Sequence, residues 1–325
     1  MYRIGIDMGG TKIAAGIVGD DGGIAAQMSV PTGEPDALRI AETTTDLIRR
    51  ILARSGVSEK EISSIGIGVP GTADQETGMI EYANNLGMEN VPFLELLQPC
   101  FPHTPMALEN DANAAAYAEY LFGAGRGCRS MVMITLGTGI GAGIILNGSL
   151  YEGINYAAGE LGHMVIEVDG RPCNCGRRGC FEQYASSLAL VAAAQAAMSE
   201  APESLLWELC RGDSSLMDGK LFFEAVRRCD AAALHVLGRY TEYLAIGIID
   251  VVNFIQPELV VIGGGISREG ELLLAPVRER MASVGYARLS RHQTRLESAL
   301  LGNDAGIIGA AFLADHRRAG RGEIS

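Results

Sequence analysis

The sequence predicts an α/β protein of two domains, built from two related halves. The chain has 325 residues, of which 48% are hydrophobic and 20% charged, and this length lets two domains each bury a core. Two segments, 2–22 and 132–150, share one pattern: an apolar strand, a short turn of glycine and threonine, and a second apolar strand. Alternating strand and helix patterns follow each segment. We expect a smaller domain at residues 1–112 and about 303–325, and a larger one at residues 113–302.

Helices and strands are expected to alternate along the chain. In residues 36–56, apolar side chains at helical spacing lie opposite charged ones, and the run ends at a glycine, which predicts an amphipathic helix. An alanine-rich run from Asp111 predicts a helix that closes near Gly123, with Asn110 or Asp111 as its N-cap. The same patterns predict strands at 64–71, 106–110 and 258–265, and helices at 187–198, through Trp207, at 231–255 and at 305–314.

A glycine-rich loop in the second half carries a set of soft metal ligands. Nine, one and four residues separate the successive ligands, which are His163, Cys173, Cys175 and Cys180. Three thiols and an imidazole are typical of a closed, structural zinc site, whereas a catalytic zinc keeps one position open for water. The interleaved carboxylates Glu160 and Glu182 indicate that the metal also shapes a binding pocket. Redox-active thiols without a metal are the alternative.

Two glycine-rich turns carry groups that bind phosphate. In DMGGTK, the glycines let backbone amides approach an anion, while Thr11 offers a hydroxyl and Lys12 a positive charge. Asp7 at the start of this motif can hold a hydrated divalent cation. LGTGIG, at residues 136–141, is a second, uncharged turn with Thr138 as its hydroxyl. The P-loop pattern is absent, and either turn taken alone could be an ordinary glycine-rich hairpin.

Asp111 is the candidate proton acceptor. A carboxylate between the end of a strand and the start of a helix points into a cleft beside the helix N-terminus, where it could deprotonate an attacking hydroxyl. Spacing alone favours a plain N-cap aspartate. A further glycine run, IGGGIS at residues 262–267, would let a ribose or a flat ring lie against the backbone, although many strand-to-helix turns look the same.

Charge and hydropathy argue against several kinds of partner. The net charge is −13 and the 26 Lys and Arg form no basic block, so nucleic acid is a poor candidate. The apolar stretch at 130–150 is broken by glycines and threonines and is not a membrane span. No apolar signal segment precedes the first strand. Four of the seven cysteines are scattered along the chain, which is typical of free thiols in a reducing compartment. We therefore expect a cytoplasmic protein.

Together these motifs resemble the ROK family of sugar kinases, particularly its zinc-containing bacterial glucokinases. The resemblance rests on DMGGTK, ENDANAAA, LGTGIGAG and the stretch from GELGH to CNCGRRGCFE, in this order over nearly the whole chain. It implies a two-domain actin-like, hexokinase-like fold of the ribonuclease H-like type, with sugar in the cleft and ATP with magnesium across the two hairpins. Repressors of this family carry a helix-turn-helix arm before the first strand, which here begins at residue 2, so we expect no DNA binding.

The resemblance also implies roles for individual residues. Asp111 would be the general base, and His163 would bind zinc through one ring nitrogen and a sugar hydroxyl through the other. The sugar contacts implied are Pro70, Gly71, Asn84, Asn85, Asn110, Asp111, Glu160, His163 and Glu182. The nucleotide contacts implied are Asp7, Gly9, Gly10, Thr11 and Lys12, then Gly137, Thr138 and Gly139, with Gly264 and Gly265 near the nucleoside.

The leading hypothesis is transfer of the γ-phosphoryl group of ATP to the 6-hydroxyl of glucose. Phosphoryl transfer needs positioning, charge stabilisation and a carboxylate that deprotonates the acceptor, and the two turns and Asp111 supply these. N-acetylmannosamine, N-acetylglucosamine, fructose and allose are alternative substrates, and another nucleotide or polyphosphate is an alternative donor. A sugar-sensing binding protein of the same fold is the non-enzyme alternative, against which Asp111 argues. The resemblance implies a homodimer or homotetramer.

Overall fold

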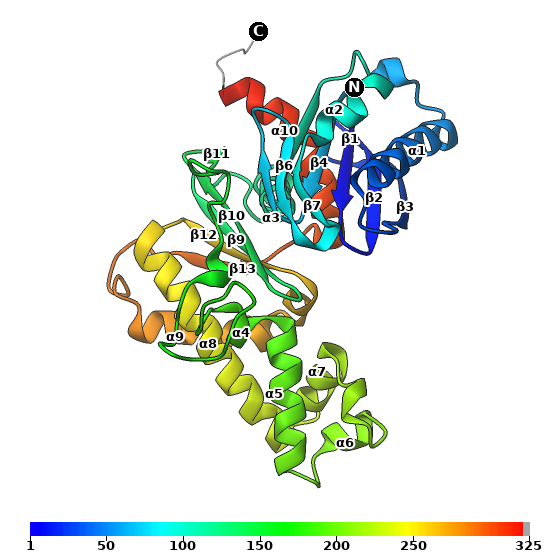
Figure 1. Cartoon of the computed structure of the whole chain (residues 1–325). Coiled ribbons are helices and arrows are strands. Elements are labelled where there is room, and N and C mark those ends of the chain that lie inside the picture. Colours follow the sequence, from blue (N-terminus) through cyan, green and yellow to red (C-terminus); the bar gives the residue numbers. More distant parts are fainter. Residues whose placement is uncertain (321–325) are drawn as a thin grey trace. The chain divides into compact units, whose positions relative to one another are not determined.

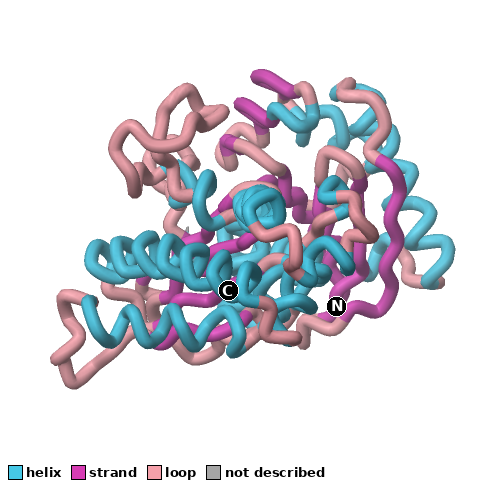
Figure 2. Tube along the Cα trace, turned by 90° about the horizontal axis from the view of Figure 1, so that it is seen from below, coloured by secondary structure: helices cyan, strands magenta, loops and turns pink. Residues whose placement is uncertain are grey.

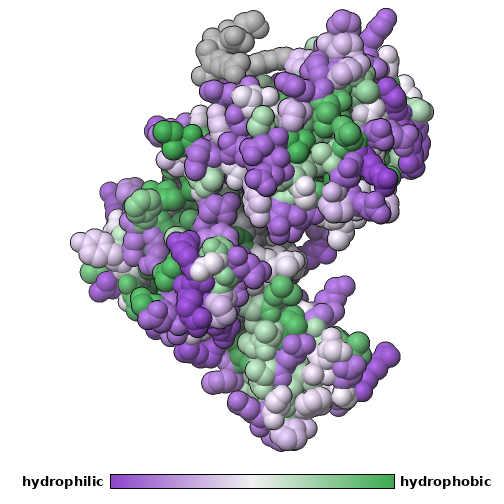
Figure 3. Space-filling model, in the orientation of Figure 1, coloured by the Kyte–Doolittle hydropathy of each residue, from purple (hydrophilic) through white to green (hydrophobic). Residues whose placement is uncertain are grey.

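A computed structural model describes residues 1–320 of the chain, which fall into two compact units (Figure 1). Unit 1 holds Met1–Val132, Gly143–Gly159 and the segment from Leu300 onward, and unit 2 holds Met133–Ala142 and Glu160–Ala299. The domain boundaries expected from the sequence stay a prediction. No helix among residues 1–320 is long and apolar enough to cross a membrane. Hydrophilic residues spread over the face shown in Figure 3, with smaller apolar areas between them.

Unit 1 is built on a five-stranded sheet with the order β3-β2-β1-β4-β8. Its strands are β1 (Tyr2–Met8), β2 (Lys12–Gly19), β3 (Ile24–Pro31), β4 (Ile62–Val69) and β8 (Met106–Asn110). The first three pair antiparallel, as the strand–turn–strand pattern predicts, whereas β1 with β4 and β4 with β8 are parallel. The carboxyl ends of β1, β4 and β8 therefore meet at one edge of the sheet.

Helices cover both faces of this sheet. The long helices of unit 1 are α1 (Ala37–Ser55), α3 (Asp111–Phe122) and α10 (Ala305–Gly320). One strand face, which includes Ile4 and Ile6, packs against the buried side of α1. On the opposite face a side chain at Gly5 or Gly66 would overlap the backbone of α10, so glycine lets that helix lie directly on the strands.

A small antiparallel sheet lies between β4 and β8 in the chain. It consists of β5 (Thr72–Asp74), β6 (Met79–Ala83) and β7 (Met88–Val91), followed by α2 (Phe93–Leu97). The short 3-10 helices of unit 1 are η1 (Glu59–Glu61), η2 (Asn84–Leu86), η3 (Gln98–Cys100) and η7 (Gly302–Asp304). This small sheet carries Asn84 and Asn85 on η2, and the sequence patterns did not predict it.

The second sheet has the order β11-β10-β9-β12-β13. Its strands are β9 (Met131–Leu136), β10 (Ile140–Leu146), β11 (Ser149–Leu150), β12 (Leu259–Gly263) and β13 (Arg295–Ser298). The neighbouring strands β9 and β10 are joined by the LGTGIG turn, as expected from the repeat. Strands β12 and β13 are parallel.

Residues 143–146 of β10 and all of β11 belong to unit 1, and outside its own strands unit 2 is mostly helical. Its helices are α4 (Glu182–Ala185), α5 (Ser187–Glu200), α6 (Leu205–Leu209), α7 (Gly219–Arg227), α8 (Ala231–Ile255) and α9 (Glu271–Val284), with η4 (Leu161–His163), η5 (Ser214–Leu216) and η6 (Gly265–Glu269). Helix α8 contacts α4, α5, α7 and α9 and is the centre of this packing. In Figure 2 helices, drawn in cyan, flank the magenta strands. The fully buried Phe181 ring lies against Gly247 of α8, where a side chain would overlap it.

Candidate active site and metal centre

The edge of the unit 1 sheet brings together three of the predicted motifs. In the parallel register, Asp7 of β1 is opposite Gly68 of β4, and Gly68 is opposite Glu109 of β8. The DMGGTK turn, the Pro70–Gly71 turn and the Asn110–Asp111 junction therefore leave the sheet side by side. Ligands of open α/β sheets bind at such carboxyl edges.

The DMGGTK turn is tight and is held from two sides. The Gly9 amide donates to the Lys12 carbonyl at 2.9 Å, and the Thr32 hydroxyl donates to the Gly9 carbonyl at 2.6 Å. A Cβ added at Gly10 would lie 3.1 Å from the Cβ of Asn85, so the small sheet brings that asparagine against the turn. Thr11 and Lys12 are exposed at the tip of the turn, where a phosphate could reach them.

Asp7 lies beneath this turn at the end of β1. Burial raises the pKa of its carboxyl, and the nearby Lys12 ammonium lowers it. A side chain at Gly306, near the start of α10, would approach the Asp7 carboxyl to about 3 Å, so glycine keeps space for it. A carboxylate in this position could hold a hydrated divalent cation.

The sequence left Asn110 and Asp111 as candidates for the N-cap of α3, and the structure shows that Asn110 is the N-cap. Its Oδ1 accepts hydrogen bonds from the amides of Ala112 at 2.9 Å and Asn113 at 3.1 Å, while its Nδ2 donates to the Gly71 carbonyl at 3.0 Å. Asp111 is the first helical residue, is partly buried, and accepts a hydrogen bond from the Ala112 amide at 2.8 Å. Because Asn110 performs the capping, a plain N-cap does not account for Asp111.

Gly71 cannot be replaced without moving the backbone around it. Its φ is 149°, and a Cβ there would overlap the Tyr82 carbonyl of β6. The turn after β4 therefore lies directly on the small sheet, and its carbonyl is presented to Asn110.

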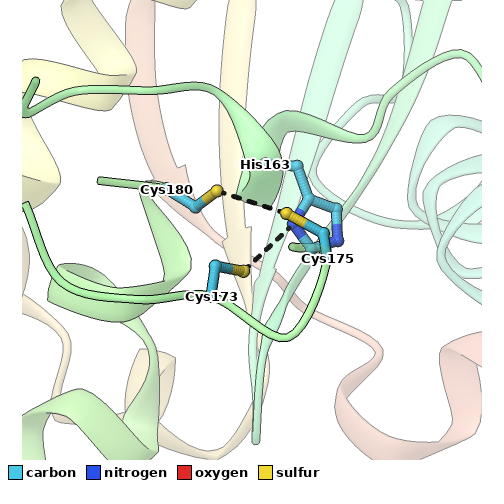
Figure 4. Close-up of side chains that lie close together, drawn as sticks. All are labelled: His163, Cys173, Cys175 and Cys180. Atoms are coloured by element: carbon cyan, nitrogen blue, oxygen red, sulfur yellow. Dashed lines mark hydrogen bonds between the residues drawn. The ribbon is translucent and has the colours of Figure 1, made fainter. Parts of the chain in front are cut away.

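The four predicted metal ligands converge in unit 2 (Figure 4). Their ligand atoms all lie within 4.8 Å of one another. The Sγ atoms of Cys175 and Cys180 are 3.6 Å apart, and Cys173 Sγ is 3.6 Å from His163 Nδ1. A tetrahedral ion with metal–sulfur bonds of about 2.3 Å separates its ligand atoms by roughly 3.6–3.8 Å, whereas a disulfide needs about 2.05 Å. The spacing fits a tetrahedral metal ion such as zinc.

The loop around these ligands is ordered by its own hydrogen bonds. The Arg177 guanidinium donates to the His163 carbonyl at 2.6 Å, and the Phe181 amide donates to the Met164 carbonyl at 2.8 Å. A hydrogen bond from the Arg177 amide lowers the pKa of the Cys175 thiol to about 6, which favours the thiolate that metals bind. Burial raises the pKa of Cys173 to about 12, and a bound cation would oppose that shift.

Two carboxylates accompany the metal ligands. Glu182 Oε1 lies 3.9 Å from His163 Nδ1 and accepts from the Cys173 thiol at 3.2 Å. Glu160 Oε2 lies 4.0 Å from His163 Nε2, the ring nitrogen on the side away from the sulfurs. Glu182 is 16% exposed and Glu160 55%, so the former belongs to the loop interior and the latter to its surface.

The second glycine turn lies against this loop. A Cβ at Gly139 would come within 2.7 Å of Glu182 Oε2, so glycine allows the carboxylate to touch the turn. The Ser187 amide donates to the Gly137 carbonyl at 2.9 Å, which attaches the start of α5 to the same turn. A cavity of about 620 Å³ borders Thr138, Gly139 and Glu182 and extends along the alanines of α5.

The third glycine motif joins the same region of unit 2. Gly264 has a φ of 87°, and a Cβ there would overlap the backbone of Leu136 at the end of β9. Gly265, which starts η6, has open space where a side chain would be. The end of β12 is therefore adjacent to the LGTGIG turn, as a nucleotide site on both motifs would require.

The predicted site residues are thus divided between the units. Unit 1 carries Pro70, Gly71, Asn84, Asn85, Asn110 and Asp111 together with the first turn, and unit 2 carries Glu160, His163 and Glu182 with the other glycine motifs. The sequence analysis did not find Thr32, Ser187 or Glu109. A glutamate inside the apolar run MALEN was the available signal for Glu109, because strand interiors rarely hold an unpaired carboxylate.

Comparisons with known proteins identify the family of the chain. A model described as the ROK family matches residues 3–317. The chain is 36% identical to a glucokinase of Halalkalibacterium halodurans, covering 96% of this chain and 94% of that protein, and 38% identical to a glucokinase of Thermotoga maritima, covering 98% of each. A crystal structure of a ROK family glucokinase from Streptomyces griseus in complex with glucose and AMPPNP has a TM-score of 0.84 and 36% identity, covering 97% of this chain and 99% of that one. The predicted fold class and the family resemblance are confirmed.

Proposed function

Because the chain belongs to the ROK family, we propose that it is an ATP-dependent glucokinase that phosphorylates the 6-hydroxyl of glucose. The observation that carries this proposal is the convergence, at one sheet edge, of a glycine turn suited to phosphate with the Asn110–Asp111 junction. The glucokinases at 36–38% identity and the related structure with glucose and AMPPNP support it.

In this proposal Asp111 is the general base. It would accept the proton of the sugar hydroxyl as that oxygen attacks the γ-phosphorus, and the bond from phosphorus to the bridging oxygen of ADP breaks. Asn110 holds the turn after β4 through Gly71 and would bind a second hydroxyl. The amides of the two glycine turns and Lys12 would stabilise the phosphoryl oxygens, and Thr11 and Thr138 would donate hydroxyl hydrogen bonds. Gly265, which has open space where a side chain would be, leaves room for the nucleoside, and Gly264 lets the end of β12 lie directly against the end of β9.

Two metals fit the residues present. Asp7 would hold a hydrated Mg²⁺, which neutralises phosphate charge when it arrives with ATP. His163, Cys173, Cys175 and Cys180 would hold a structural Zn²⁺ that fixes the loop. The loop then keeps Glu160 and Glu182 and the outward Nε2 of His163 in position for sugar hydroxyls.

Steady-state kinetics over a panel of sugars test this function. ADP release is coupled to a reporter enzyme with glucose, N-acetylmannosamine, N-acetylglucosamine, fructose and allose as acceptors. ATP, other nucleotides and polyphosphate are compared as donors. We expect the highest kcat/KM with glucose and ATP. A higher kcat/KM with another sugar would replace glucose as the proposed substrate. Absence of turnover with every sugar would refute the proposed kinase activity.

Asp111→Asn tests the base. We expect a loss of at least about 100-fold in kcat with glucose binding retained, because general-base catalysis contributes 10²–10⁴-fold. The matched control is Asp36→Asn, at the N-cap of α1 in the same unit, where asparagine caps equally well. Unchanged turnover in Asp111→Asn would show that another group is the base. Tight glucose binding by the wild type without turnover would favour the sugar-sensing protein.

We also propose that the enzyme is cytoplasmic and forms a homodimer or homotetramer, with no nucleic-acid or membrane partner. Light scattering coupled to size-exclusion chromatography measures the oligomeric state. A monomer at micromolar concentration would contradict this part of the proposal.

A further inference from the structure

A buried glutamate lies directly before the Asn110–Asp111 junction. Glu109 is 1% exposed and follows the three apolar residues that begin β8. Its Oε1 accepts hydrogen bonds from the Asn110 amide at 2.8 Å and from Asn113 Nδ2 at 2.9 Å. Its Oε2 accepts from Gln75 Nε2. A buried carboxyl costs free energy unless it is fully hydrogen-bonded, and this one has a partner on each oxygen.

A cation from the C-terminal helix braces the same network. Arg317 of α10 donates to the Gln75 carbonyl at 2.7 Å and to Gln75 Oε1 at 3.2 Å, and a third hydrogen bond reaches the Leu108 carbonyl. Arg317 is 242 residues away from Gln75 in the chain. The guanidinium thus joins α10, the turn after β5 and the end of β8 within unit 1.

The hydrogen bonds of Glu109 lead to the first turn of α3. Its two Oε1 partners are the backbone of the N-cap residue Asn110 and the side chain of Asn113, on either side of Asp111. Asn110 in turn holds the Gly71 carbonyl. A change at Glu109 would therefore rotate or release the turn on which the Asp111 carboxylate is mounted.

We propose that Glu109 is a positioning residue of the phosphoryl-transfer site, which orients Asp111 through Asn110 and Asn113 and is itself held by Gln75, which Arg317 fixes in place. This inference rests on the proposed role of Asp111 as the base. Glu109 touches neither the sugar nor the phosphate in this assignment.

The protonation of Glu109 adds a testable signature. Burial, and then the neighbouring Glu152 carboxyl, raise its pKa to about 8, so at neutral pH it is protonated and shares a hydrogen bond with Glu152. Further titratable or charged groups around this pair, among the described residues, include Arg317 and His316 of α10, Tyr117 of α3, Asp74 of β5, Glu76 and Tyr156. Above about pH 8 Glu109 would lose its proton, and the negative charge that this adds to the buried pair would weaken the turn.

Three variants test the proposal in the full-length protein. Glu109→Ala removes the network, and Glu119→Ala is the matched control. Glu109→Gln keeps the shape and the Oε1 acceptor of the protonated glutamate, while its amide nitrogen can donate to Glu152 but cannot accept from Gln75. Glu119 is also fully buried in unit 1, and it accepts from the amides of Leu301 at 2.7 Å and Ala124 at 2.9 Å, outside this network. For each variant, kcat, the KM values for glucose and ATP, the pH profile from 6 to 10 and the Tm are measured.

We expect Glu109→Ala to lower kcat by about 10- to 100-fold, since a displacement of about 1 Å in an active site can cost 10²-fold, while the KM for ATP stays within about threefold. Glu119→Ala should lower the Tm but leave kcat within about threefold. Glu109→Gln should keep kcat at pH 7 within about threefold of the wild type and should lose the alkaline fall near pH 8.

The outcomes separate this inference from the proposed function. Wild-type activity together with an unchanged kcat in Glu109→Ala, whatever its Tm, overturns the positioning role alone. Should Glu109→Ala fail to fold, the pH profile decides: an alkaline limb in Glu109→Gln identical to the wild type overturns the role. An inactive wild type refutes the proposed function, and full activity in Asp111→Asn refutes the assignment of the base. In either case the positioning role of Glu109 is refuted as well.

Discussion

The stability of unit 1 should fall as the pH rises from 5 to 8, and Glu109→Gln should make this dependence clearly weaker. The pKa of Glu109 rises from an ordinary 4.5 to about 8 in the folded protein, first because of burial and then because of Glu152. A group with a raised folded-state pKa binds its proton more tightly in the native state. Its contribution to stability is therefore fully present below pH 4.5 and is lost as the pH rises through about 8.

The size of this effect follows from proton linkage. Between these two pKa values the native state holds one proton more than the unfolded chain, so the free energy of unfolding falls by about 1.4 kcal/mol per pH unit. From pH 5 to pH 8 this amounts to about 4 kcal/mol, a large share of the 5–15 kcal/mol that stabilises a typical domain. In Glu109→Gln, Glu152 faces a neutral amide, and this contribution disappears.

Urea unfolding at pH 5, 6, 7 and 8 and constant ionic strength measures the slopes. Hydrogen exchange of the β1, β4 and β8 amides follows unit 1, since a chain of two units need not unfold in one step. The control Glu119→Gln should retain the wild-type slope because it leaves the Glu109–Glu152 pair intact. Parallel pH curves for the wild type and Glu109→Gln, or stability that increases with pH, would refute the reasoning.

Three further predictions concern the metal loop and the two turns. Cys175→Ala should raise the KM for glucose more than the KM for ATP, and Cys229→Ala is the control; a defect only toward ATP would contradict this. Zinc analysis of the wild type should give about one ion per chain, and less than about half an ion would count against the metal site. Gly139→Ala should raise the KM for glucose several-fold because its Cβ would displace the Glu182 carboxylate. Gly238→Ala, at a position with open space, should leave this KM unchanged, and equal kinetics in the two variants would argue against a contact between Gly139 and Glu182. Asn110→Ala should lower the unfolding free energy by about 1–2 kcal/mol in urea titrations through loss of the helix cap, and an unchanged value would show that the cap is not needed.

Local signals predicted several elements well. Helix α1 begins after Asp36, whose side chain accepts from the Arg39 amide, and ends at Gly56 in the left-handed conformation. The limits of α8, 231–255, also agree with the expected helix, which had to end before Pro257. These predictions succeeded because the caps and the hydrophobic period lie within the segment itself.

Other elements carried weaker local signals. Helix α9 contains Pro276, which normally ends a helix, and the small sheet of β5, β6 and β7 consists of short strands with a register shift. Both depend on packing against distant segments. Propensity and periodicity do not report such packing.

By itself, the sequence determined which chemistry the chain could carry. The spacing of His163, Cys173, Cys175 and Cys180 indicated a metal site, and the glycine turns with Asp111 indicated phosphoryl transfer, because these motifs are short and contiguous. Only the tertiary structure decided which groups touch: Glu182 against Gly139, Asn85 against Gly10, and Gln75 against both Arg317 and Glu109. Such contacts join residues tens to hundreds of positions apart, and strand register and close packing at glycine, which bring them together, are properties of the folded chain.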